Sequence, residues 1–245
     1  MRIEKYLILN KYLLSLFGAD DFKDLQEKLK DAPSGTDSDG RTHFVNTLRS
    51  SIKNLKISED TLLYYDANIQ SYVRKINYKR APVSLKYFQY LAVLFAEVFL
   101  DNLKNRKLEF LYKLNEFLKS YEYEEVKEII GQFKENDLKK IAFWMATGSG
   151  KTLIAHINYF QFIKYKLFEP DNIIFITPNE GLSKQHFEEL QKSGIPARLY
   201  SGSLNGGLRN EREVLIIEMT KFVEEKKGGG VTLPVDTFEG KNLVF

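Results

Sequence analysis

Cysteine is missing from the 245-residue chain, and histidine occurs only three times. Without cysteine, the protein forms no disulfides, binds no metal through thiolates and uses no thiol nucleophile. The histidines are scattered and do not have the spacing of a metal-binding cluster. These absences exclude a disulfide-stabilised scaffold and a thiolate zinc site, and they agree with a protein of the reducing cytoplasm.

The chain also has little excess charge and no long uninterrupted apolar run. Its formal net charge of +3 does not by itself indicate nucleic-acid binding. The segment from Arg41 to Lys86 contains nine basic residues but only three acidic ones. This block can contact phosphates, but a solvated helical face carries the same pattern, and we adopt that interpretation. The most apolar stretch, residues 90–100, contains Glu97 and is about half a membrane span, so it predicts a buried helix and no membrane segment.

Hydrophobic residues make up 43% of the sequence, which is ample for a buried core. In the N-terminal region they recur at helical spacing and predict helices. These helices are expected near residues 6–17, 22–29, 43–53 and 59–74. Ala81 and Pro82 then break the pattern. We therefore predict a mostly helical N-terminal region, residues 1–82, and a second domain, residues 83–245.

The second domain begins with helices and continues with alternating strands and helices. Apolar helical patterns are expected near residues 85–100, 108–118, 153–163 and 182–190. Short apolar runs predict strands at residues 141–145, 172–177, 197–200, 214–218 and 242–245. Such alternation is typical of an α/β fold in which a parallel sheet is covered by helices.

The segment after the first expected strand carries the strongest chemical signal. Residues 145–152 read Met-Ala-Thr-Gly-Ser-Gly-Lys-Thr and precede an apolar helical pattern. Glycines in such a turn bring backbone N–H groups close to phosphate oxygens, and the positive end of the following helix adds to the attraction. The alternative is a chance Gly-Ser-Gly turn before a surface helix. The pattern predicts a phosphate-binding loop made of Thr147, Gly148, Ser149, Gly150, Lys151 and Thr152.

Three blocks together resemble the first motor domain of superfamily 2 helicases, in the branch that contains the helicase subunit of type III restriction enzymes. The general phosphate-loop pattern has Gly where this chain has Met145, but the form found here, with Ala146 before Gly-x-Gly-Lys-Thr, is similar to that of this family. Residues 86–92 resemble its Gln-containing element, and residues 174–179 resemble its motif Ia. The resemblance covers residues 85–245.

This resemblance implies a RecA-like parallel sheet with flanking helices that binds ATP and Mg²⁺. Lys151 would reach the β- and γ-phosphates, and the Thr152 hydroxyl would hold the metal. Gln89 would lie near the adenine, although a glutamine in an apolar helix is also commonly a satisfied polar group. Loops after two strands would hold the DNA backbone, with plain connecting loops as the alternative. The implied nucleic-acid contacts are Thr177, Pro178, Asn179, Thr220 and Lys221.

The relatives continue from the strand near residue 242 into an acidic Asp-Glu-x-His motif that holds Mg²⁺, whereas this sequence ends at Phe245. Their second motor domain, which supplies an arginine for the transition state, is also outside the sequence. We therefore expect an N-terminal piece that keeps phosphate binding, and we assign no catalytic residue. An alternative puts the metal at Glu218 after four apolar residues, although Met219 stands where a second carboxylate belongs.

The sequence thus predicts the ATP-binding N-terminal portion of a DNA-dependent ATPase, helicase or translocase. Its expected cofactors are ATP and Mg²⁺, and its expected partners are DNA and a methyltransferase and recognition subunit. Two other functions stay open. One is a nucleotide-binding module that lacks turnover, and the other is a phosphate-loop kinase for a small molecule, whose lid and acceptor-binding residues we do not find.

Overall fold

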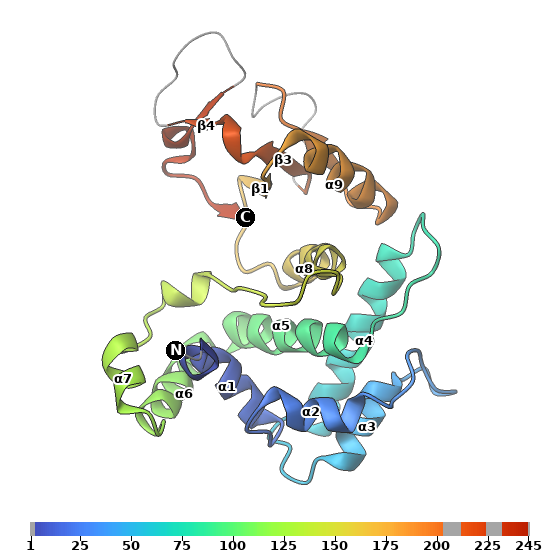
Figure 1. Cartoon of the computed structure of the whole chain (residues 1–245), viewed down its shortest axis with the longest axis vertical. Coiled ribbons are helices and arrows are strands. Elements are labelled where there is room, and N and C mark those ends of the chain that lie inside the picture. Colours follow the sequence, from blue (N-terminus) through green and yellow to red (C-terminus); the bar gives the residue numbers. More distant parts are fainter. Residues whose placement is uncertain (1–2, 203–211, 224–231, 245) are drawn as a thin grey trace. The chain divides into compact units, whose positions relative to one another are not determined.

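The computed structural model describes residues 3–202, 212–223 and 232–244. The chain divides into two compact units (Figure 1). The first contains residues 1–73 and 83–165, and the second contains residues 74–82 and 166–245. This division differs from the single boundary expected after residue 82, because the helices that follow residue 83 pack with the N-terminal region.

The described part of the first unit is mainly helical, and every helix predicted for the N-terminal region is confirmed. Their bounds are α1 (Ile8–Leu16), α2 (Phe22–Leu29), α3 (His43–Ser51), α4 (Glu59–Ile76), α5 (Tyr87–Asn105), α6 (Lys107–Lys119), α7 (Glu124–Ile130) and α8 (Lys151–Tyr165). Thr42 fixes the start of α3, because its side chain accepts a hydrogen bond from the backbone N–H of Val45. None of the described helices combines the length and apolar character needed to cross a bilayer.

Helix α5 forms the centre of the first unit (Figure 1). The apolar stretch predicted as a buried helix lies on it, and its side chains are buried on almost every side. Phe17 packs on Phe95, and Phe44 packs on Tyr90, with ring centroids 5.5 and 5.3 Å apart. Helix α8 packs along the same helix. The burial of large aromatic and aliphatic surfaces around α5 is the main stabilising contribution in this unit.

The second unit contains a four-stranded parallel sheet in the order β2-β3-β1-β6. Its strands are β1 (Asn172–Thr177), β2 (Ala197–Leu199), β3 (Val214–Glu218) and β6 (Leu243–Val244). The two central strands are rich in β-branched residues, which favour extended backbone. All four were predicted, although Phe245 lies outside the described residues. A smaller sheet pairs β4 (Phe222–Val223) with β5 (Leu233–Pro234).

Helix α9 (Glu180–Lys192) packs on β1, β2 and β3. It covers the face to which Phe175 points, and the rings of Phe175 and His186 lie 4.7 Å apart. Successive side chains of a strand point to opposite faces, so Ile174 faces the other side. A core forms there from Ile174, Tyr200, Leu215, Ile217 and Leu233. The fold class is therefore the predicted one, a RecA-like α/β arrangement of a parallel sheet with flanking helices and a helical N-terminal region.

Residues 74–82 belong to the second unit through polar contacts with α9. The guanidinium of Arg80 donates hydrogen bonds to the backbone oxygen of Glu189 at 2.8 Å and to the Ser193 hydroxyl at 2.6 Å. It also forms an ion pair with the Glu189 carboxylate at 3.3 Å. This arginine, one of the nine basic residues between Arg41 and Lys86, therefore has a structural role and is not presented to a phosphate backbone.

The strand predicted at residues 141–145 is wrong. These residues are irregular in the structure, and the side chains of Ile141 and Trp144 are 43% and 84% exposed. Their apolar composition led us to predict a buried strand, but a strand also needs a neighbour for its backbone N–H and C=O groups. The ladders of the described sheets join other segments. Of the expected strand, turn and helix around the loop, the structure contains the turn and the helix.

Candidate functional site

The predicted phosphate-binding loop lies in the first unit and leads directly into α8. Gly148 and Gly150 have φ angles of +76° and +87°, a region in which residues with a side chain are strained. The N–H of Ile154 donates to the Gly150 carbonyl at 3.2 Å and starts the helical hydrogen bonds. Lys151 is therefore the first residue of α8. The two glycines produce a tight turn that places a lysine at the positive end of a helix.

In this structure the loop makes hydrogen bonds with itself. The Lys151 ammonium donates to the carbonyl oxygens of Met145 at 3.1 Å and Ala146 at 3.0 Å. The N–H of Ser149 also donates to the Ala146 oxygen, at 3.2 Å. A bound phosphate would have to take the ammonium from two neutral carbonyls. That exchange is favourable because a phosphate oxygen is negatively charged, so the ammonium gains an attraction between opposite charges that the carbonyls do not supply.

Gln89, at the start of α5, contacts the loop directly. Its amide nitrogen donates to the Ser149 carbonyl at 2.8 Å, and its amide oxygen accepts from the Lys86 backbone N–H at 2.9 Å. A Cβ atom placed on Gly150 would lie 2.5 Å from that amide nitrogen. The sequence analysis predicted that Gln89 would lie near the adenine. In the structure both ends of its amide are used to join the loop to α5.

The loop has features that fit a nucleotide phosphate. Besides the ammonium of Lys151 and the start of α8, the Ser149 hydroxyl oxygen is buried and has no hydrogen-bond partner among the described residues. Buried hydroxyls rarely stay unpaired in native proteins. Thr152 would offer one oxygen to Mg²⁺. Within the described part of the chain, no group of three or more His, Asp or Glu side chains could hold a metal ion.

The residues predicted to bind nucleic acid lie in the second unit, at the carboxyl ends of β1 and β3. Thr177 and Glu218 are register partners, so the two predicted loops leave the sheet at one edge. The Thr177 side chain is buried, and its hydroxyl lies 2.6 Å from that of Ser183. The Asn179 amide oxygen caps α9 by accepting the N–H of Leu182 at 2.9 Å. The two side chains thus make structural hydrogen bonds, while Pro178, Asn179 and Thr220 are exposed.

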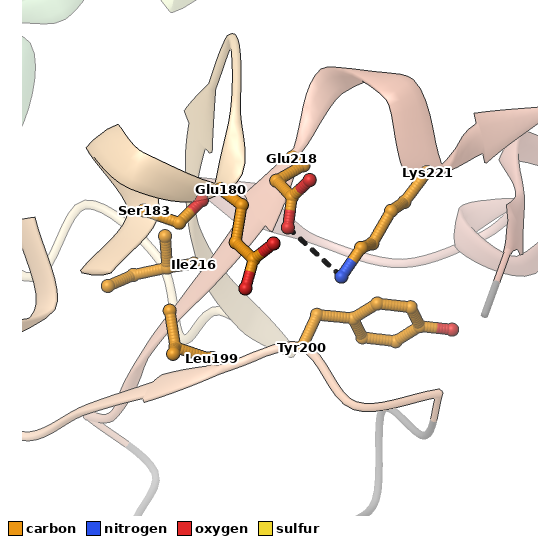
Figure 2. A pocket seen from close by; sticks show the side chains of 7 residues that line it. All are labelled: Glu180, Ser183, Leu199, Tyr200, Ile216, Glu218 and Lys221. Carbon is orange, nitrogen blue, oxygen red and sulfur yellow. Dashed lines mark ion pairs between the residues drawn. The ribbon is translucent and has the colours of Figure 1, made fainter.

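A pocket of about 190 Å³ opens at this edge (Figure 2). Lys221 turns back toward the strand, and its ammonium lies 3.0 Å from the Glu218 carboxylate. Figure 2 shows this ion pair and the Glu180 side chain, which also lines the pocket. The pocket is lined by Glu180, Ser183, Leu199, Tyr200, Ile216, Glu218 and Lys221.

Paired charges characterise the surroundings of this pocket. Besides the pair of Glu218 and Lys221, Glu180 forms an ion pair with Lys184 at 2.7 Å. The hydrogen bond from Lys184 lowers the pKa of Glu180, so this carboxylate is charged at neutral pH. Burial lowers the pKa of His186 on the same helix, so its imidazole is neutral at that pH. A DNA phosphate would compete with carboxylates for each lysine.

Sequence reasoning missed Glu180, Ser183 and Tyr200. A signal for Tyr200 was present, because it directly follows β2, and parallel strands end at the same edge of a sheet. The position of Ser183 could be expected only once Asn179 was known to cap a helix. Glu180 lines the pocket because it belongs to the first turn of that helix.

The parallel sheet and its flanking helices define the class of the protein as a RecA-like α/β protein. A comparison with family models matches residues 116–238, half of the chain, to the type III restriction enzyme res subunit. The chain belongs to this family, whose domain is helicase-like. Neither the curated proteins nor the solved structures contain a significant match.

Proposed function

We propose that the chain binds ATP and Mg²⁺ through residues 147–152 and forms the nucleotide-binding part of a DNA-dependent ATPase of the helicase or translocase type. The observation that carries the proposal is the turn itself, in which Gly148 and Gly150 have positive φ and lead to Lys151 at the start of α8. Membership of the res subunit family supports the ATPase class. We further propose that it acts in the cytoplasm, beside a methyltransferase and recognition subunit.

In this proposal, two residues of the loop, Lys151 and Thr152, and Gln89 of α5 have definite tasks. Mg²⁺, when bound, would neutralise charge on the phosphates. The ammonium of Lys151 would leave the Met145 and Ala146 carbonyls and bind phosphate oxygens, while the Thr152 hydroxyl would hold the metal. The amide of Gln89 would keep the loop against α5 and lie near the adenine.

ATP turnover with and without single-stranded DNA tests the function. Turnover stimulated by DNA supports the motor, ATP binding without turnover supports the nucleotide-binding module, and transfer of phosphate to a small molecule supports a kinase. The module has one observation in its favour. The carboxylate best placed as a rival metal ligand, that of Glu218, is paired with Lys221 at 3.0 Å. DNA-stimulated turnover that is lost in Glu218→Gln would instead move the metal site to the end of β3.

For DNA, we propose weak, sequence-independent contacts of the DNA backbone with Pro178, Asn179, Thr220 and Lys221. The buried Thr177 would hold the first of these loops in place through its hydrogen bond with Ser183. Lys221→Ala is expected to weaken binding of a labelled single strand and to reduce its salt dependence by about one phosphate contact. Fluorescence anisotropy over a salt series measures both. Glu218→Gln, which frees the ammonium from its ion pair, is the matched variant and is expected to strengthen binding.

Other outcomes contradict this assignment. If neutralising Arg74, Lys75 and Lys79 removes DNA binding while Lys221→Ala leaves it unchanged, the DNA is held by these three residues at and after the end of α4. If the wild-type chain and both variants bind no DNA in low salt, the contacts proposed at this sheet edge are refuted.

A further inference from the structure

Helix α5 is joined to the loop and to α8 at two separate places. Near its start, Gln89 holds the Ser149 carbonyl. About two turns further along, the fully buried Glu97 accepts hydrogen bonds from the Gln161 amide at 2.9 Å and the Tyr165 hydroxyl at 2.7 Å. Both donors lie on α8, in its second half. The two helices are therefore fixed to each other at the loop and again near the end of α8.

The surroundings of Glu97 make this second attachment strong and specific. A third donor, the Asn68 amide on α4, reaches the carboxylate at 3.1 Å, and the oxygen of that amide accepts a hydrogen bond from Lys164 of α8. Burial, together with the charge of Glu97, raises the pKa of Tyr165, so the phenol stays protonated and donates at neutral pH. Removing a single partner from such a buried network leaves another polar group unsatisfied, so the arrangement is narrowly defined.

We propose that Glu97 is a positioning residue for the phosphate-binding loop, because through Gln161 and Tyr165 it fixes α8, and thereby the place of Lys151 and Thr152. An α-helix transmits a restraint along its axis, since every turn is hydrogen-bonded to the next. The effect on nucleotide affinity rests on the proposed function, whereas the effect on loop mobility does not. The residues of this network are expected to be energetically coupled to one another, and α8 carries their restraint to the loop at its start.

A pair of tyrosine variants tests the proposal. Tyr165→Phe removes the phenol that joins α8 to Glu97. Tyr65→Phe is the matched control, because this buried tyrosine of α4 donates to the Asp101 carboxylate of α5 at 2.9 Å and has no part in the attachment of α8. Each change removes one hydroxyl from a tyrosine to carboxylate hydrogen bond. A purely structural role for both bonds predicts similar consequences for the two variants.

Two measurements on the full chain compare the variants. ATP titrations followed by the fluorescence of Trp144, the single tryptophan, which is 84% exposed beside the loop, give the affinity. Hydrogen exchange without nucleotide gives the mobility of residues 147–153. We expect Tyr165→Phe to weaken ATP binding about three- to tenfold and to accelerate exchange in the loop, whereas Tyr65→Phe changes neither while lowering the melting temperature to a similar extent.

The two proposals fail in distinguishable ways. If the wild type binds no ATP but Tyr165→Phe still accelerates loop exchange selectively, the positioning role of Glu97 stands and the nucleotide-binding function is refuted. Equal loop exchange and equal ATP affinity in the two variants would overturn the positioning role. If Tyr165→Phe does not fold, Gln161→Glu and Glu97→Gln, which preserve size, replace it in the same two measurements, with the same outcomes deciding.

Discussion

Replacing Lys151 by alanine is expected to weaken ATP binding about ten- to a hundredfold. The reason is that this ammonium is the cation that the turn of Gly148 and Gly150 places at the start of α8. Losing a hydrogen bond to a charged group costs about 1.5–3 kcal/mol, which corresponds to that range of affinity. Isothermal titration calorimetry with Mg-ATP measures the loss directly.

Lys140→Ala is the matched control, because it removes the same charge from an exposed residue ahead of the loop. It should leave the affinity within about twofold, since an exposed charge several residues away is screened by salt. Circular dichroism must show that both variants are folded. Equal affinity for Mg-ATP in the wild type and in a folded Lys151→Ala protein would remove the assignment of a phosphate-binding loop.

Gly150→Ala is expected to weaken ATP binding by at least as much. The φ of Gly150 is +87°, which costs a residue with a side chain about 1–2 kcal/mol. The added methyl would also lie 2.5 Å from the Gln89 amide nitrogen, so the contact between loop and α5 would have to give way. Overpacking of this kind costs roughly 1–3 kcal/mol more.

Gly148→Ala separates these two costs. Gly148 has a similar φ of +76°, but a Cβ there would meet nothing within 4 Å. It should therefore show the conformational strain alone and bind ATP more tightly than Gly150→Ala. Adding Gln89→Ala to Gly150→Ala should recover part of the difference in ATP affinity between the two glycine variants. Calorimetry on the wild type, the two glycine variants and the double variant measures it. Identical affinities in the two glycine variants would mean that Gln89 does not constrain the loop.

Much of the fold could be predicted because local patterns agreed with the tertiary structure. The strands at 172–177 and 214–218 are short apolar runs between polar segments, and their bounds are those of β1 and β3. Helix α5 followed from an apolar stretch too short for a membrane. The strand at 141–145 failed because its composition says nothing about a partner strand, and the structure leaves Trp144 exposed.

Those parts of the candidate site that are formed by residues adjacent in the sequence could be predicted. The parts that depend on contacts between residues far apart in the sequence could not. A glycine turn followed by Lys151 is local, so its shape followed from the motif. The hydrogen bonds of Gln89 with Ser149 and of Glu97 with Tyr165 join residues 60 and 68 positions apart. Nothing in the sequence marked Glu97 as more than a polar residue in an apolar helix. Its role depends on which helices pack against α5.

The contacts of Arg80 with α9 have a consequence for how the chain folds as it is made. The guanidinium of Arg80 and the backbone oxygen of Glu189 are separated by 109 residues, and the segment that carries Arg80 interrupts the sequence of the first unit. On the ribosome, this segment therefore emerges well before the helix that it joins has been synthesised. Contacts of such high sequence separation form late. The first unit would then fold while residues 74–82 still lack their partner helix, and the second unit would be completed only when translation has passed α9.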